Sequence, residues 1–184
     1  MDTGNNINWQ RLISALTFYK SHGYKYIDLD WSVNSEISEI TKPVDKKDFF
    51  INGKALVASG EQSFLQMIKD GDLPNGKYCG ITPCFRDEHV LDELHQQYFM
   101  KVELIDTLQV NNNSLMKILE ICKEFFEKYI PVEIIKIDKN SYDIIDCKNK
   151  IELGSYGLRR YENMEWLYIT GLAEPRLSRV LKLQ

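Results

Sequence analysis

Between residues 84 and 103, charged and aromatic side chains alternate with apolar ones, and this stretch carries the residue types best suited to chemistry. Side chains two residues apart on a β-strand share a face. If the two halves of the stretch pair as antiparallel strands, one face presents four of these side chains: Arg86, Glu88, Phe99 and Glu103. A guanidinium can bind phosphate oxygens through two hydrogen bonds, and an aromatic ring can stack on a nucleobase. The face would therefore suit a planar, anionic ligand; the alternative is an exposed sheet face with cross-strand ion pairs.

The periodicity of apolar residues predicts the elements that would position these side chains. Spacings of three and four predict helices over residues 9–22, 61–71 and 115–129, and from about Pro175. Short runs of strand-forming residues predict strands over residues 24–33, 77–88, 97–110, 132–138, 141–146, 150–155 and 164–170. Asn52–Gly53 predicts a hairpin turn, and the polar residues 34–48 predict an exposed loop. Adjacent strands with helices between some of them predict an α+β fold, a single domain over residues 1–184 with a mostly antiparallel sheet flanked by helices.

Composition narrows the classes of protein to consider. The formal net charge of the 184 residues is −4, which gives no global field for attracting nucleic acid, so DNA is not an expected partner. No apolar run is long enough to span a membrane, and residues 1–10 lack the basic and apolar regions of a signal peptide. We therefore expect a cytoplasmic protein. Its four cysteines are expected to be reduced thiols rather than zinc ligands: Cys79, Cys84, Cys122 and Cys147.

The order and spacing of residues 84–103 resemble motif 2 of the class II aminoacyl-tRNA synthetases. Cys84-Phe85-Arg86-Asp87-Glu88 is followed, after a short loop, by His95-x-x-x-Phe99-x-x-x-Glu103. The resemblance implies that Arg86 holds the α-phosphate of ATP and the carboxylate being activated. It also implies that Glu88 lies near the adenine amino group, that Phe99 stacks on adenine and that His95 approaches the terminal phosphates. The resemblance also implies that Glu103 is one of the ATP-binding residues.

Two later segments follow in the order of the same family. Residues 151–159, Ile-Glu-Leu-Gly-Ser-Tyr-Gly-Leu-Arg, resemble a strand of the aspartyl/asparaginyl branch and of the ammonia-dependent asparagine synthetase. This implies that Glu152 binds Mg²⁺ and that Arg159 lies near the substrate carboxylate. Residues 171–177 resemble motif 3, in which Arg176 would hold the γ-phosphate, although Glu174 and Pro175 replace small residues. Arg179 is a second candidate for the role of Arg176.

Two segments nearer the N-terminus complete the resemblance. Ser59-Gly60-Glu61 lies where many family members bind the amino group of the substrate, which implies that Ser59 and Glu61 are substrate-binding residues. Residues 9–24 resemble the helix of motif 1, but Asp30 replaces the proline that usually ends it. Because motif 1 forms the dimer in the family, a homodimer is left open. Four residues are expected to line or flank the amino-acid pocket: Tyr142, Asp143, Tyr156 and Arg159.

The resemblance implies ATP-dependent activation of an amino acid as its adenylate, with ATP and Mg²⁺ as cofactors. We expect no anticodon-binding or editing domain in the chain, so the acceptor would be ammonia, a protein, a carrier or a small RNA. A first alternative is a non-catalytic paralogue that binds ATP or an amino acid for regulation, which the altered motifs 1 and 3 favour. A second is a minimal aminoacyl-tRNA synthetase that needs a partner chain to bind tRNA.

Overall fold

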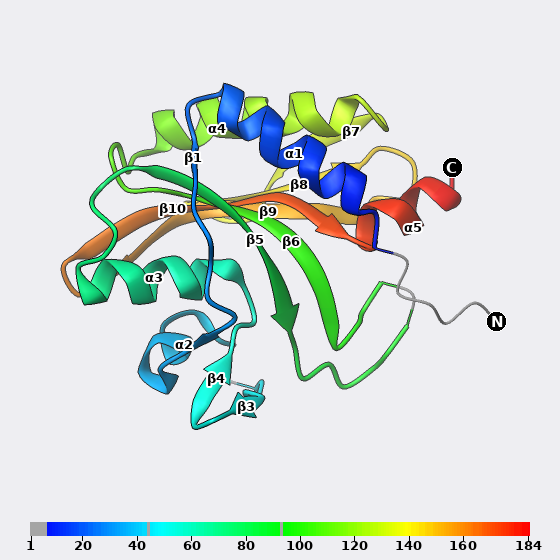
Figure 1. The fold of residues 1–184 in the computed structure, drawn as a ribbon. Helices are drawn as coiled ribbons and strands as arrows, with labels where there is room; N and C mark the ends of the chain where they lie inside the picture. The colour runs from blue at the N-terminus through cyan, green and yellow to red at the C-terminus, as the bar shows by residue number, and fades with distance from the viewer. Residues whose placement is uncertain (1–6, 44, 93) are drawn as a thin grey trace.

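A large, strongly twisted sheet forms the centre of the fold (Figure 1). The computed structural model describes residues 7–43, 45–92 and 94–184. The seven strands lie in the order β1-β5-β6-β10-β9-β8-β7, and only the pairing of β1 with β5 is parallel among the described strands. Their bounds are Lys25–Tyr26, Lys77–Phe85, Tyr98–Asp106, Met164–Glu174, Glu152–Tyr161, Ser141–Asp146 and Val132–Lys136 in that order. The predicted α+β class with a mostly antiparallel sheet is confirmed.

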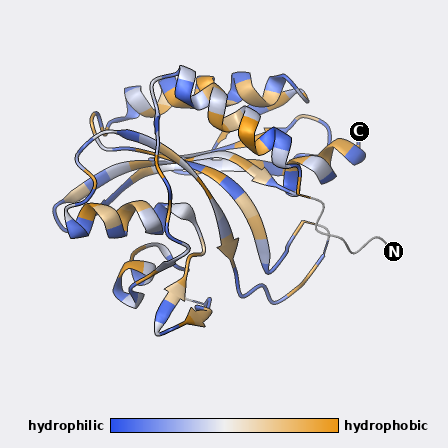
Figure 2. Ribbon diagram, viewed as in Figure 1, coloured by the Kyte–Doolittle hydropathy of each residue, from blue (hydrophilic) through white to orange (hydrophobic). Residues whose placement is uncertain are grey.

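Helices cover both faces of this sheet (Figure 1). Helices α1 (Trp9–Ser21) and α4 (Asn112–Glu127) pack on one face, where they share a large apolar core with the strands. Helix α3 (Gly60–Asp70) packs on the other face over a smaller apolar cluster. Figure 2 shows hydrophobic residues running through the central strands and recurring along α1 and α4. No helix in the described ranges has the length and apolarity needed to cross a membrane.

Local signals in the sequence set the ends of these elements. The side chain of Asn111 accepts a hydrogen bond from the Ser114 amide and so caps α4. Gly71 ends α3 in the left-handed region, with φ of 81°. The hairpin turn predicted at Asn52–Gly53 is confirmed, since both residues have positive φ, 50° and 77°, as a two-residue turn of type I′ requires. It joins β3 (Phe50–Ile51) to β4 (Lys54–Leu56), which with β2 (Ser32–Val33) forms a small second sheet.

Two sequence-based expectations are wrong. Residues 34–48 are not simply an exposed loop, because they contain the helix α2 (Ser35–Thr41) with Ile37 and Ser38 buried against α3. A helix of seven residues is too short to give a clear apolar period. Residues 24–33 do not form one strand: β1 belongs to the large sheet and β2 to the small one. Residues 1–6, part of the segment used to exclude a signal peptide, lie outside the described residues.

A buried ion pair ties the first helix to the end of the central strand β10. Arg11 on α1 donates to the carboxylate of Glu174, whose side chain is completely buried. Ser178, on α5 (Arg176–Lys182), adds a second donor to that carboxylate at 2.7 Å and accepts from Arg11 at 2.9 Å. Glu174 lies opposite Met100 on the neighbouring strand, on the face packed by α1. Glu174, which replaces a small residue of motif 3, therefore fixes the start of α5.

We expect Arg11→Met to lower the free energy of unfolding by about 3–5 kcal/mol, because it leaves the Glu174 carboxylate buried without its cation. The double variant Arg11→Met/Glu174→Gln should recover much of that loss, since no charge is then left unpaired. Urea denaturation measures both. The matched control is Arg160→Met, which removes an exposed arginine paired with Glu165 and should cost less than about 1 kcal/mol. Equal costs for the two single variants would contradict the structural role of the buried pair.

Candidate functional site

A pocket of about 300 Å³ lies on the face of the large sheet opposite α1 and α4, a volume at the lower end of small-molecule sites. Strand β6 supplies part of its floor, because Lys101 and Glu103 alternate with the core residues Met100 and Val102. Strands β9 and β10, the start of α3 and residues 41–43 and 46–48 close its sides. The walls are balanced in charge, with six basic and six acidic side chains among the described lining residues.

Of the ten residues to which the sequence assigns a catalytic, ATP-binding, substrate-binding or metal-binding role, with Arg179 as an alternative to Arg176, seven line this pocket. They come from four separate parts of the chain: Ser59, Glu61, Arg86, Glu88, Glu103, Glu152 and Arg159. The other three, His95, Phe99 and Arg176, are not part of its lining. Phe99 and Arg176 border a small notch beside it. The side chain of His95 is about half exposed and contacts Asp92 at 2.9 Å.

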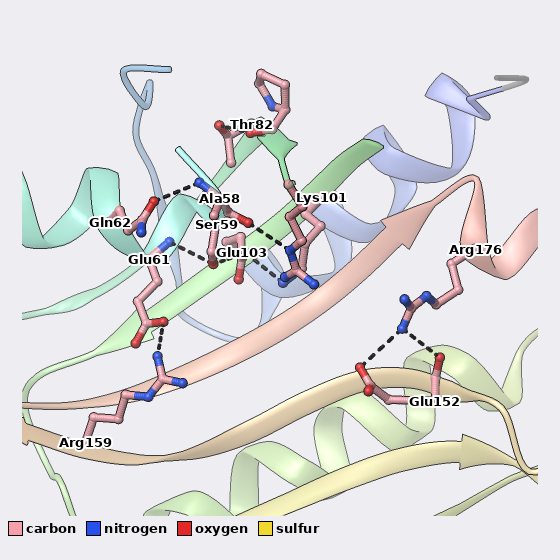
Figure 3. Close-up of polar contacts among 12 residues, drawn as sticks. Ala58, Ser59, Glu61, Gln62, Thr82, Lys101, Glu103, Glu152, Arg159 and Arg176 are labelled. Atoms are coloured by element: carbon pink, nitrogen blue, oxygen red, sulfur yellow. Dashed lines mark hydrogen bonds and ion pairs between the residues drawn. The ribbon is translucent and has the colours of Figure 1, made fainter. Parts of the chain in front are cut away.

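Glu61 is a buried carboxylate with two donors, and it lies at the first turn of α3 (Figure 3). Arg159 donates to its Oε2 at 2.6 Å, and the indole of Trp166 donates to its Oε1 at 2.6 Å. Burial nevertheless raises the pKa of Glu61, although Arg159 and Trp166 act in the opposite direction. The partners within the chain therefore do not fully compensate the burial of this carboxylate.

Glu103 is held by the side chains on either side of it (Figure 3). Its Oε1 accepts from Ser59 Oγ at 2.5 Å and contacts Lys101 Nζ at 2.7 Å. Gly60 makes this possible, since a Cβ there would lie 2.6 Å from Thr82 Cγ2 and 3.0 Å from Glu103 Cγ. The start of α3 can approach the sheet only with glycine at this position. Glu103 thus anchors Ser59 and Lys101, and its carboxylate is almost fully buried.

Arg86 follows the end of β5 and turns its guanidinium across the sheet. Its Cζ lies 5.0 Å from the centre of the Phe99 ring, and its Nε donates to the Ala58 carbonyl at 3.3 Å. Strand register explains the contact between Arg86 and Phe99, because Cys84 pairs with Phe99 and Arg86 lies two residues beyond Cys84. Glu88 is held by Lys46 at 3.0 Å. Arg86 and Glu88 are therefore both at the pocket with partners from within the chain.

Glu152 begins β9 and faces the start of α5 (Figure 3). Arg176 contacts its Oε1 at 3.3 Å, and the Glu152 side chain remains about half exposed. Asp143 lies on the adjacent strand β8, opposite Ser155. Burial, and then the charge of Glu152, raise the pKa of Asp143. Two carboxylates that repel each other supply the hard oxygen donors that Mg²⁺ prefers, usually one or two per ion with the rest from substrate and water. No group of three or more histidine, cysteine, aspartate or glutamate side chains that could hold a metal ion occurs among the described residues.

Several residues of the site could not be singled out from the sequence. Lys46 comes from the segment 41–48, whose approach to Glu88 depends on the fold of α2. Trp166 pairs with Arg159 across β9 and β10, and Tyr168 lies beneath the Arg159 guanidinium at 4.2 Å. Lys101 is an exception, because alternation along β6 places it on the same face as Phe99 and Glu103. The sequence pattern could therefore have identified it as a site residue.

The prediction that Tyr142 and Tyr156 line the pocket is wrong. Tyr156 is fully buried in the core on the opposite face of the sheet, and Tyr142, which pairs with it across β8 and β9, packs against the same core. Asp143 and Ser155 alternate with them and so lie on the pocket face. A shift of one residue along a strand exchanges faces, and the motif spacing alone did not resolve this for the tyrosines.

The raised pKa of Glu61 predicts a pH dependence of stability. Between its ordinary value of 4.5 and the raised value, the folded protein holds a proton that the unfolded chain has released, so stability falls as pH rises through this window. Glu61→Gln removes this titration. We expect the unfolding free energy of the wild type minus that of the variant to decrease as pH rises above about 4.5. Denaturant titrations at several pH values measure the difference; a constant or increasing difference would contradict the assignment.

Similarity to solved structures identifies the fold. No protein-family model and no curated protein matches the sequence. The chain is similar in structure to the seryl-tRNA synthetase of Pyrococcus horikoshii complexed with ATP, with a TM-score of 0.74 and 17% identity over 92% of this chain and 48% of that one. It is also similar to the serine-tRNA ligase of Naegleria fowleri in complex with AMP, with a TM-score of 0.68 and 18% identity over 89% and 50% of the two chains.

A third similar structure is a pyrrolysyl-tRNA synthetase of Desulfitobacterium hafniense, with a TM-score of 0.72 and 15% identity over 95% of this chain and 68% of that one. The chain spans about half the length of the two seryl enzymes. At these identities the similarity concerns the fold. The chain has the fold of the catalytic core of class II aminoacyl-tRNA synthetases.

Proposed function

We propose that this chain is a catalytic core that uses ATP and Mg²⁺ to activate an amino acid as its aminoacyl adenylate. One observation carries the proposal. Seven residues chosen from three sequence segments converge on a single pocket. In the reaction, a carboxylate oxygen of the amino acid forms a bond to the α-phosphorus. The bond from that phosphorus to the β-phosphate oxygen breaks, and pyrophosphate leaves.

Three charged residues would orient the reacting groups. Arg86 can bind an α-phosphate oxygen and the attacking carboxylate together, because its guanidinium offers donors along two edges. Glu61 would accept the ammonium of the amino acid, which would offset the cost of its burial. Arg159, already paired with Glu61, would contact a carboxylate of the substrate, either the α-carboxylate or an acidic side chain as in the aspartyl/asparaginyl branch. Charge neutralisation and orientation of this kind are the main sources of rate enhancement in phosphoryl chemistry.

Phe99, Glu88 and Arg176 would hold the nucleotide. Adenine stacks on Phe99 with its amino group toward Glu88, and Arg176, with His95 approaching from its loop, binds the terminal phosphates. Arg86 now covers one side of the Phe99 ring, and Lys46 binds Glu88. Nucleotide binding would therefore require Phe99 and Glu88 to exchange these contacts for contacts to adenine. Ser59 and Glu103 position the start of α3 beside the substrate.

Glu152 and Asp143 would hold Mg²⁺ against the phosphates. The ion would neutralise charge that accumulates on the pyrophosphate as it leaves. Arg176, which now contacts Glu152, would then be free to bind phosphate.

A second function is favoured by the internal pairing of the site. Arg86, Glu88 and Arg176 each have a partner within the chain, which is also what a paralogue that binds nucleotide without turnover would tolerate. Such a protein would bind ATP but give no amino-acid-dependent exchange of pyrophosphate into ATP. We favour the enzyme because one pocket is lined by charged residues suited to the substrate ammonium, the α-phosphate and Mg²⁺: Glu61, Arg86 and Glu152.

Arg86→Ala should lower the rate of amino-acid-dependent ATP–pyrophosphate exchange by about 100-fold or more, the usual effect of removing one group that stabilises transition-state charge. Arg159→Ala should weaken binding of the amino acid more than that of ATP. The matched control is Arg160→Ala, the next residue on β9, whose side chain is exposed and points to the other face. A variant without Arg86 that exchanges at the rate of the control would exclude the role given to Arg86.

A further inference from the structure

Strand β10 carries two aromatic residues that contact the ion pair between Glu61 and Arg159. Trp166 and Tyr168 alternate with core residues along this strand and lie on the face that packs against α3. The indole Nε1 of Trp166 donates to Glu61 Oε1 at 2.6 Å, and Arg159 donates to Oε2 at 2.6 Å. The Tyr168 ring lies beneath the Arg159 guanidinium at 4.2 Å. Each oxygen of the Glu61 carboxylate thus has a donor from the sheet.

Trp166 is enclosed by its neighbours, which fixes the direction of its N–H group. Only 1% of the residue is exposed, and it packs in the smaller apolar cluster with Phe64 and Leu65 of α3. An indole has one donor and no acceptor, so its hydrogen bond to Glu61 uses its full capacity. The packed ring therefore holds one oxygen of Glu61 at a defined place.

The indole stabilises the ionised form of Glu61 without adding a charge. Burial raises the pKa of this carboxyl, and the hydrogen bond from Trp166 acts in the opposite direction. A lysine or arginine in place of the indole would also favour the carboxylate, but its positive charge would repel a substrate ammonium. A neutral donor orients the carboxylate and leaves its attraction for that ammonium intact.

We infer that Trp166 is a positioning residue for amino-acid recognition, which holds the Glu61 carboxylate ionised and oriented so that it can accept the substrate ammonium. This inference rests on the proposed function, in which Glu61 accepts that ammonium. Trp166 acts through Glu61 rather than on the substrate itself. Loss of its N–H group should therefore weaken binding of the amino acid and leave binding of ATP unchanged.

The N–H group can be removed without changing the shape of the ring. 3-Benzothienylalanine has the outline of tryptophan, with sulfur in place of the N–H group. Trp9 and Trp31 are exposed, so the double variant Trp9→Phe/Trp31→Phe should fold and leaves Trp166 as the one tryptophan of the chain. Expression of this variant in a tryptophan auxotroph then places the analogue at position 166 alone.

We expect the analogue to raise the KM for the amino acid about 10-fold or more, the usual effect of losing a hydrogen bond to a charged group. The KM for ATP and the kcat should change by less than about twofold, because the lost interaction supports binding of one substrate.

The pH dependence distinguishes positioning from a purely structural role. The substrate ammonium binds ionised Glu61, and loss of the indole donor raises the pKa of Glu61 further. The other titratable or charged groups that face this carboxylate are Arg159 on β9, Glu103 on β6 and Tyr168 on β10, and the analogue retains all three. Affinity for the amino acid should rise with pH in both proteins, and with the analogue this rise should lie at higher pH.

ATP–pyrophosphate exchange, with the amino acid that the wild type activates, measures both KM values and the kcat over a range of pH. The matched control is 5-fluorotryptophan in the same background, which keeps the N–H group and should keep the KM values of that background. Trp166→Phe removes the N–H group and part of the ring, should show at least the same loss, and remains informative if the analogue is not incorporated.

Two results would overturn the inference while the proposed function stands. One is an amino-acid KM equal to that of the fluorinated control over the whole pH range. The other is an equal rise in the KM for ATP, which would indicate a general disturbance of the pocket. If the wild type gives no exchange with any standard amino acid, the proposed function fails and the inference fails with it.

Discussion

The pocket depends on one constraint, the alternation of side chains along the three central strands of the sheet. On β6, Met100, Val102 and Leu104 pack beneath α1 and α4, and the residues between them, Lys101 and Glu103, face the pocket. The apolar face packs against the helices and thereby fixes the position of the charged face. A slip of one residue in the register would bury these charges in the core, so the packing that stabilises the fold also fixes which side chains can meet a ligand.

Burial of charge on that face has a second consequence. Glu61 and Glu103 are nearly inaccessible to water, and cations together with hydroxyl or indole donors contact each carboxylate. Arg159 and Arg176 each contact a carboxylate that we propose to bind substrate or metal. Ligand binding would then replace contacts within the protein by contacts to ammonium, phosphate and Mg²⁺, with little change in the positions of the strands. When a charged side chain exchanges a partner within the protein for a ligand, the free-energy cost is lower than when solvated side chains must first lose their water.

The parts of the site that lie on single strands could be predicted from the sequence. Side chains two residues apart on a strand share a face, so the sequence spacing places Arg86, Phe99 and Glu103 on one side of the paired strands. The Asn52–Gly53 turn likewise predicts the hairpin that it forms. Contacts between distant segments could not be predicted in this way. Lys46 reaches Glu88 only because the short helix α2 packs on α3. Trp166 on β10 reaches Glu61 only because α3 packs over that face of the sheet. Glu174 seemed to fill a position that should be small, but its side chain points to Arg11 on the opposite face.

The central claim is that the pocket forms a mixed anhydride between an amino acid and AMP. The most direct test is to incubate the wild-type protein with ATP, Mg²⁺ and the standard amino acids, first pooled and then one at a time, and to detect the aminoacyl adenylate by mass spectrometry. We predict an adenylate and an equal amount of pyrophosphate, with one amino acid or one chemical class of amino acids. Tight binding of ATP without adenylate formation for any amino acid would contradict the claim and identify the chain as a nucleotide-binding relative of the synthetase core.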